Sequence, residues 1–262
     1  MLARVGSFIF WAFIALSSLL LFPVAVAIWA TTVLVDRRRV VLHRFTCFWA
    51  SLYTWLNPAW RVQVAGREKI RPGVPYVMVA NHQSFLDILV LFRLFVHYKW
   101  VSKIEMFRIP CIGWNMALNG YIKLRRGDAQ SVAEMMRACE RTLAGGNPIM
   151  MFPEGTRSAD GRLKAFKAGA FVLAQRARVP LLPIVVEGTA CALPKHGFVL
   201  RGRHAIRIRV LDEIAFTSFA EKPIDRLVAE VHDVFSRELG ERPSVAAPGS
   251  TVVASRAAGD AR

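Results

Sequence analysis

Apolar residues change their spacing along the chain, and each spacing predicts a different kind of element. Between about residues 60 and 240, short apolar runs alternate with longer segments in which apolar residues recur every three or four positions. The short runs predict buried strands, and the longer segments predict helices with one apolar face. The expected strands cover residues 61–64, 77–80, 100–102, 121–124, 149–152, 181–186 and 205–211.

Helices are expected between these strands. In residues 129–144, Met135, Cys139 and Leu143 fall on one face, and Gly145 follows as a stop signal. Strands that alternate with helices predict an α/β fold with a largely parallel central sheet flanked by helices. The expected helices cover residues 85–95, 110–118, 129–144, 166–177 and 224–239.

The first 60 residues have a different pattern, which predicts one membrane helix or a pair of them. No charge occurs from Val5 to Val35, a run that would form a helix roughly 46 Å long against about 30 Å of hydrocarbon. Pro23 lies inside this run and is able to kink or split a helix. Residues 36–39 then read Asp-Arg-Arg-Arg, a cluster expected to stay in the cytoplasm.

A second uncharged stretch, Phe45 to Trp60, is rich in Trp and Tyr, which favour the headgroup boundary. Two topologies fit: a single tilted span followed by an interfacial helix, or two helices that dip into one leaflet. A cleavable signal peptide is the competing interpretation, because Ala25-Val26-Ala27 resembles a cleavage site. Against it, Arg4 is the only charge before the run, and the run continues beyond the site.

Composition supports contact with a membrane. The chain has 35 Lys and Arg against 19 Asp and Glu, a formal charge of +16, and 54% of its residues are hydrophobic. A chain that is both basic and apolar suits an anionic bilayer. A nucleic-acid binder or a soluble basic protein would account for the positive charge but not for the high apolar content. The four cysteines are scattered without metal-ligand spacing, which predicts reduced, buried thiols and no metal site.

These patterns divide the chain into three parts. Residues 1–60 form the membrane-associated helices, residues 61–241 form the catalytic domain, and residues 242–262 are expected to be disordered because they are rich in Ala, Ser, Gly and Pro. No internal repeat is evident.

Residues 81–87, Asn-His-Gln-Ser-Phe-Leu-Asp, follow an expected strand and begin an expected helix. In such a turn Asp87 can reach back to His82, fix the tautomer of the imidazole and leave its other nitrogen free to accept a proton. The form Ser-x-x-Asp also places a helix start at Ser84. A simpler interpretation of the pair is that Asp87 caps the helix and His82 is a buried loop histidine.

Residues 152–158, Phe-Pro-Glu-Gly-Thr-Arg-Ser, follow another expected strand. Gly155 permits a tight turn, Thr156 offers a hydroxyl, and Arg157 can bind a phosphate with two hydrogen bonds. Glu154 has an alternative role in holding the loop through backbone N–H groups. Polar loops at strand ends are where open α/β sheets place their chemistry, so we expect the two loops to form one site.

Two further segments add weaker signals. Residues 120–126, Gly-Tyr-Ile-Lys-Leu-Arg-Arg, end a strand in a basic pair that suits an acidic headgroup or a solvated turn. Residues 179–184, Val-Pro-Leu-Leu-Pro-Ile, are apolar and suit either the lining of an acyl channel or an ordinary buried strand.

The four segments, in this order, resemble the blocks of the glycerolipid acyltransferase superfamily, in particular its 1-acylglycerol-3-phosphate O-acyltransferase (lysophosphatidic acid acyltransferase) family. Residues 81–87 match its His-x4-Asp (HX4D) motif, residues 152–158 match its third block, and the likeness extends over residues 60–220. Trp100-Val101-Ser102-Lys103 is similar to a lysine-bearing segment of the family.

This resemblance implies a glycerolipid acyltransferase-like fold and acyl transfer from acyl-CoA or acyl carrier protein to the free hydroxyl of a lysophospholipid. The acceptor that the resemblance implies first is 1-acyl-glycerol-3-phosphate, which gives phosphatidic acid. The acyl donor is a substrate, and no cofactor or nucleic acid is implied. It also implies that His82 is the general base, that Asp87 orients it, and that the acceptor site draws on Lys103, Arg126, Glu154, Gly155, Thr156 and Arg157.

Two residues depart from the family pattern. Arg125 stands where members commonly carry an acid, and Lys123 replaces an apolar residue. These departures favour alternative acceptors, such as another lysophospholipid or an acyl-amino-acid lipid. A non-catalytic basic lipid-binding protein of the membrane is the alternative from a different functional class.

Overall fold

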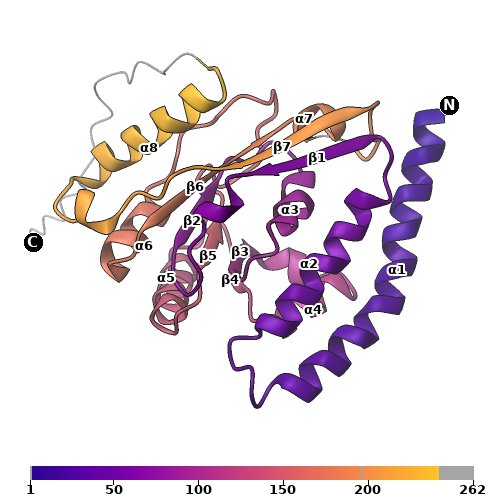
Figure 1. The fold of residues 1–262 in the computed structure, drawn as a ribbon, viewed down its shortest axis with the longest axis horizontal. Helices are drawn as coiled ribbons and strands as arrows, with labels where there is room; N and C mark the ends of the chain where they lie inside the picture. Colours follow the sequence, from indigo (N-terminus) through magenta and orange to yellow (C-terminus); the bar gives the residue numbers. More distant parts are fainter. Residues whose placement is uncertain (1, 196, 242–262) are drawn as a thin grey trace, which may run out of the picture.

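A computed structural model describes residues 2–195 and 197–241, and its centre is a seven-stranded sheet with helices on both faces (Figure 1). The strand order is β1-β7-β6-β2-β5-β3-β4. The predicted α/β class and the position of every predicted strand are confirmed. The strands are β1 (Trp60–Ala65), β2 (Val77–Ala80), β3 (Lys99–Lys103), β4 (Ile122–Leu124), β5 (Ile149–Met151), β6 (Leu181–Glu187) and β7 (His204–Val210).

The sheet is parallel except where β7 runs antiparallel to β6. Strand β2 lies between β5 and β6, with Val77 opposite both Ile149 and Leu181. The carboxyl ends of β2, β3, β4, β5 and β6 therefore meet at one edge of the sheet. The two loops singled out in the sequence begin at this edge.

Helices cover both faces because the central strands are apolar on both sides. Met78 packs in a core with α1, α2 and α3, while Val77 and Val79 pack in a second core with α5, α6 and α8. A strand that is buried on both faces has apolar residues at successive positions, as residues 77–80 have. The helices are α1 (Leu2–Thr32), α2 (Val40–Trp55), α3 (Leu86–Leu91), α4 (Ile112–Leu118), α5 (Ala129–Ala144), α6 (Gly169–Ala177), α7 (Thr189–Ala192) and α8 (Ile224–Glu238).

Helix α5 has its predicted bounds, and Asp128 caps it by accepting a hydrogen bond from Ser131 N. The helix predicted over 85–95 is shorter, because it tightens into a 3-10 turn at Phe92–Leu94. Helix α3 begins at Leu86, two residues after the predicted start at Ser84, and Ser84 Oγ accepts a hydrogen bond from Leu86 N at 3.2 Å. Asp87 ties residues 83 and 84 into the preceding turn. The predicted disordered tail, 242–262, lies outside the described residues.

Helix α1 runs unbroken through Pro23, so the split considered from the sequence does not occur, while the helix bends along its length in Figure 1. It is long and apolar enough to cross a membrane. Near its start, Ser7 Oγ accepts a hydrogen bond from Leu200 N at 2.8 Å. The Trp11 indole donates to Phe198 O at 2.7 Å. The amino-terminal part of α1 is therefore fastened to the loop that follows α7.

The far end of α1 is fastened to the same domain. In the segment between α1 and α2, Arg38 donates to Gly146 O, and Lys99 Nζ donates to Arg38 O at 2.8 Å. Between these ends, the Ser17 and Tyr53 hydroxyls, 3.0 Å apart, join α1 to α2. Helices α1 and α2 lie side by side along the α/β domain (Figure 1).

Candidate active site

The loops after β2 and β5 are bonded to each other through their backbones. Ser158 N donates to His82 O at 2.8 Å, and His82 N donates to Glu154 Oε1 at 2.6 Å. Because β2 and β5 are neighbours in the sheet, the loops begin side by side. The expectation that residues 81–87 and 152–158 meet is therefore confirmed by direct contacts.

His82 and Asp87 form a hydrogen-bonded pair. Nδ1 of His82 lies 2.9 Å from Oδ2 of Asp87, and the carboxylate has no exposed surface. The same oxygen accepts backbone hydrogen bonds from Gln83 N and Ser84 N, each at 2.7 Å. Asp87 thus caps the turn and orients the imidazole at once, so the two interpretations of the sequence describe one arrangement.

The imidazole of His82 is fixed by a stacking contact as well. Its ring lies 3.8 Å from the ring of Phe152 and nearly parallel to it, with 8° between the planes. Its side chain is only 9% exposed. Within the described residues, Nε2 has no hydrogen-bond partner and is not a fully buried polar atom. This nitrogen is the free position from which the pair can accept a proton.

Two buried polar residues that the sequence analysis did not assign hold this pair in place. Thr189, on α7, donates a hydrogen bond from its hydroxyl to Asp87 Oδ1. The Asn81 amide joins β2 to β6, donating to Val186 O and accepting from Val186 N, both at 2.8 Å. The available signal was position: Thr189 is a polar residue directly after a buried strand, as His82 is.

Glu154 is a buried carboxylate that supports the loops. Oε1 accepts from His82 N, and Oε2 accepts from Lys164 N at 3.2 Å. Burial raises the pKa of Glu154 to about 7, although the two backbone N–H groups act in the opposite direction. Both carboxylate oxygens of Glu154 therefore accept hydrogen bonds from backbone N–H groups. These contacts agree with the alternative considered from the sequence, in which Glu154 holds the loop.

The rest of this loop carries positive charge at the sheet edge. Gly155 has φ +71°, and a Cβ built there would come within 3.0 Å of the Lys167 side chain, so Lys167 lies across the turn. Thr156 and Arg157 are half-buried. Among the described residues, Arg157 has no carboxylate partner, which leaves its guanidinium available to an anion.

Lys103 and Arg126 lie on the same edge but on strands farther from β2. Lys103 ends β3 and pairs with Glu105 at 3.4 Å, and Arg126 follows β4. Both side chains are exposed, and neither contacts His82 or Asp87 by a hydrogen bond. Arg125, the departure from the family pattern, lies 3.7 Å from Asp128.

Three cysteines, Cys47, Cys111 and Cys139, are buried as expected. The prediction is wrong for Cys191, whose side chain is exposed because it lies on the short α7 at the rim of the sheet. Among residues 2–195 and 197–241, no group of His, Cys, Asp and Glu is arranged to hold a metal ion. Two hollows of about 340 and 600 Å³ lie away from His82, along α8.

Comparison with known proteins agrees with this geometry. A family model described as acyltransferase matches residues 61–187. A 1-acyl-sn-glycerol-3-phosphate acyltransferase of Chlamydomonas reinhardtii is 40% identical over 196 residues, which cover 74% of this chain and 58% of that protein. One of Saccharomyces cerevisiae is 34% identical over 192 residues, covering 70% of this chain and 62% of that protein.

The chain spans about half the length of the curated relatives it matches. Among solved structures, the 1-acyl-sn-glycerophosphate acyltransferase PlsC of Thermotoga maritima has the same fold, with a TM-score of 0.70. It is 21% identical, and the match covers 92% of this chain and 98% of that chain.

Proposed function

We propose that the chain, which the acyltransferase family model matches over residues 61–187, transfers an acyl group from acyl-CoA or acyl carrier protein to the free hydroxyl of 1-acyl-glycerol-3-phosphate, giving phosphatidic acid. The observation that carries the proposal is the His82–Asp87 pair, held by the loop that contains Arg157.

In this reaction Nε2 of His82 takes the proton of the acceptor hydroxyl as its oxygen attacks the thioester carbonyl. The new C–O bond forms, the C–S bond breaks, and the departing thiolate takes the proton back from the imidazolium. Asp87 keeps the proton of the neutral ring on Nδ1, which leaves Nε2 free to act as the base. A thioester is already activated, so the enzyme needs no nucleophile of its own.

The charge of the acceptor fits the loop after β5. Arg157 and Lys167 come from this loop and the segment that follows it, beside the turn at Gly155. A guanidinium binds a phosphate with two parallel hydrogen bonds, and a lysine adds charge without fixed geometry. Lys103 and Arg126 add positive charge farther along the same edge and are proposed to draw the phosphate towards it.

The test uses purified protein in detergent, lysophosphatidate and either thioester donor, with release of free thiol and formation of phosphatidic acid measured together. We expect His82→Ala to lower kcat by about 10²–10⁴-fold, the usual contribution of a general base. His232→Ala, on α8, is the matched control because this histidine packs on Phe166 and lies 3.5 Å from the Ser236 hydroxyl through Nδ1, contacts outside residues 81–87 and 152–158. Equal product from wild type and His82→Ala would remove His82 as the base.

A second acceptor is favoured by one observation. Arg125 is exposed, lies 3.7 Å from Asp128 through Nη1 and stands where family members commonly carry an acid, so two arginines follow β4. A panel of lysophospholipids and acyl-amino-acid lipids, assayed with one donor, tests this alternative. A strict preference for lysophosphatidate would exclude it, and lipid binding without turnover on any acceptor would favour the non-catalytic alternative.

We also propose that α1 and α2 hold the catalytic domain on the cytoplasmic side of a membrane, with both helices in one leaflet. Both ends of α1 are hydrogen-bonded to the same domain, which a spanning helix could not keep. In a Cys191→Ser background, which removes the exposed native thiol, Arg4→Cys and Arg37→Cys would both react with a membrane-impermeant maleimide added from the cytoplasmic side. Reaction of the two positions from opposite sides would show a span instead.

A further inference from the structure

Few large apolar side chains of the α/β domain are exposed, and four of the five in its described part lie in or next to two segments that contact α1, namely helix α4 and the loop after α7. They are Ile109, Trp114, Phe198 and Val199, whereas Val132 alone lies elsewhere, on α5. Phe198 is 76% exposed. Exposed aromatic residues that collect in one region mark an interaction surface rather than ordinary surface variation.

Phe198 lies in the loop between α7 and β7, which is fastened to the start of α1. Its carbonyl accepts the Trp11 indole hydrogen bond, and the two rings meet edge to face at 5.9 Å. On α1 the neighbouring Phe8 is 74% exposed. The exposed ring of Phe198 therefore extends the apolar face of α1 and is held there by the backbone.

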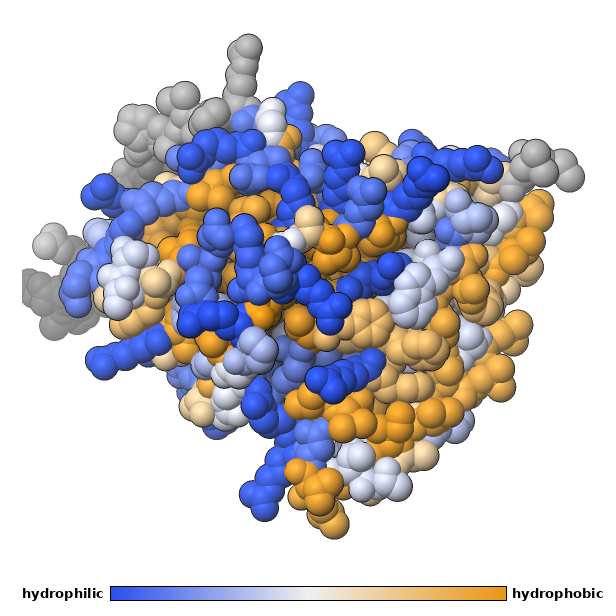
Figure 2. All heavy atoms as spheres, viewed as in Figure 1, coloured by the Kyte–Doolittle hydropathy of each residue, from blue (hydrophilic) through white to orange (hydrophobic). Residues whose placement is uncertain are grey.

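Trp114 extends the same apolar surface from another part of the domain. It is 49% exposed on α4, and its ring packs against Phe22 of α1 at 5.4 Å. In the sheet order, α7 follows β6 on one side of β2, and α4 joins β3 to β4 on the other. The two aromatic residues thus come from opposite sides of β2, the strand before the His82 turn, and α1 contacts both. Figure 2 shows the apolar surface along this side of the molecule.

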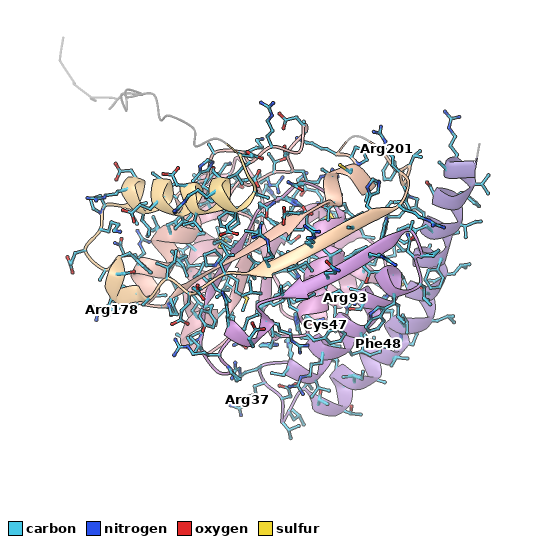
Figure 3. The ribbon with its side chains drawn as sticks, turned by 45° about the horizontal axis from the view of Figure 1, so that its top comes forward. Arg37, Cys47, Phe48, Arg93, Arg178 and Arg201 are labelled. Atoms are coloured by element: carbon cyan, nitrogen blue, oxygen red, sulfur yellow. The ribbon has the colours of Figure 1, made fainter. Side chains whose placement is uncertain are left out.

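Positive charge borders both places. Arg201 and Arg203 follow Phe198 and are exposed, and Arg108 precedes Ile109. Figure 3 shows Arg201 on the loop beside the amino-terminal end of α1. Aromatic rings next to arginines are typical of segments that lie at an anionic bilayer surface, where the rings enter the interface and the cations meet headgroups.

We propose that Phe198 and Trp114 are membrane anchors of the α/β domain itself, additional to α1 and α2, and that their partner is an anionic lipid bilayer. The loop of Phe198 is also tied to the His82 turn, because Ser84 Oγ donates to Leu193 O at 2.6 Å. The anchors hold the carboxyl edge of the sheet at the level of the headgroups, where a lipid acceptor enters. This inference rests on the proposed function for the nature of that acceptor.

The depth of each anchor can be measured directly with an environment-sensitive fluorophore. Cys191 is the exposed cysteine among the four, so Cys191→Ser provides the background. Single cysteines are then introduced as Phe198→Cys and Trp114→Cys, with Leu20→Cys on α1 as the positive control and Val132→Cys as the negative control. The labelled proteins are bound to vesicles of phosphatidylcholine and phosphatidylglycerol that contain a lipid-chain quencher.

We expect quenching at positions 198, 114 and 20 and none at position 132. Quenching at position 20 with none at 198 and 114 would overturn the proposal, because the helix pair would then bind without the domain. A lack of quenching at position 20 as well would overturn both this proposal and the membrane attachment proposed above. None of these outcomes depends on whether the protein has acyltransferase activity.

Charge is tested with the full chain and two double variants. Arg201→Gln with Arg203→Gln should weaken binding to anionic vesicles about 25-fold, since each arginine near such a surface contributes roughly fivefold. Arg176→Gln with Arg178→Gln, at the end of α6, is the matched control of equal charge. Equal effects of both pairs would show that net charge alone attracts the bilayer and would overturn a local role for this loop.

Discussion

Thr189 donates its hydroxyl hydrogen bond to the carboxylate oxygen of Asp87 that does not face His82, across 102 positions of sequence. The other oxygen of Asp87 accepts from the imidazole and from two backbone N–H groups. Both oxygens are thereby fixed, and rotation of the carboxylate would break bonds on each side. The ring of His82 is oriented through Asp87 by a residue that follows a different strand.

We predict that Thr189→Val lowers kcat about 10–100-fold and leaves KM for lysophosphatidate little changed. The substitution removes a hydrogen bond to a charged group, usually worth about 1.5–3 kcal/mol, while the binding residues stay in place. Thr189→Ser keeps the hydroxyl and should restore most of the rate. Steady-state kinetics of the three proteins measures this, and a similar loss in the Ser variant would indicate that packing at α7 matters rather than the hydrogen bond.

Glu154 predicts a pH dependence of stability in the acid range. Its pKa is raised from 4.5 to about 7 by burial, so between these values the folded protein holds a proton that the unfolded chain has lost. Stability from this group is fully present below pH 4.5 and is lost as the pH rises through 7, by up to about 3 kcal/mol.

The test of Glu154 compares denaturation of wild type and Glu154→Gln in detergent at several pH values. Because Gln does not ionise, the unfolding free energy of the wild type should fall relative to that of Glu154→Gln as the pH rises from 4.5 to 7. Curves that stay parallel over this range would contradict the protonation of Glu154 in the fold.

From Lys99 we predict the opposite dependence in the alkaline range, a stability that rises with pH. Burial lowers its pKa from 10.5 to about 7, while Nζ donates to Arg38 O and to Asn119 O. Between pH 7 and 10.5 the unfolded chain holds more protons, so stability from this group rises with pH, by up to about 5 kcal/mol. Lys99→Met should lose this slope. Lys123→Met, which replaces an exposed lysine of β4, serves as the control and should keep it.

We predict that the stability of the fold depends on the hydrogen bonds of Asn81, which link the end of β2 to β6. Its amide pairs with both backbone groups of Val186, so Asn81→Asp, of nearly equal shape, places a carboxylate oxygen against Val186 O. The loss of one donor and the unpaired buried charge should cost about 3 kcal/mol or more. Thermal unfolding measures this cost. Asn57→Asp, at a surface turn before β1, is the control and should differ little from wild type.

Local patterns were sufficient to predict most elements from the sequence. Residues 77–80 and 129–144 have the predicted bounds, since an apolar run and a helical spacing each ended at a clear boundary. The turn with His82 and Asp87 was also predictable, because its partners are five positions apart. For Glu154 the sequence suggested that the carboxylate holds its own loop through backbone N–H groups, but not that it also bonds His82 N in a distant loop, which no local pattern encodes.

The sequence by itself determined an α/β fold with an apolar amino-terminal region, and it identified the polar loops that carry the candidate chemistry. Only the tertiary structure decided that β2 and β5 are neighbours, that Thr189 reaches Asp87, and that α1 lies along the domain. The physical reason is range. Periodicity and turn residues act over a few positions, whereas strand order and the contacts of α1 depend on how segments far apart in the chain bury their apolar surface together.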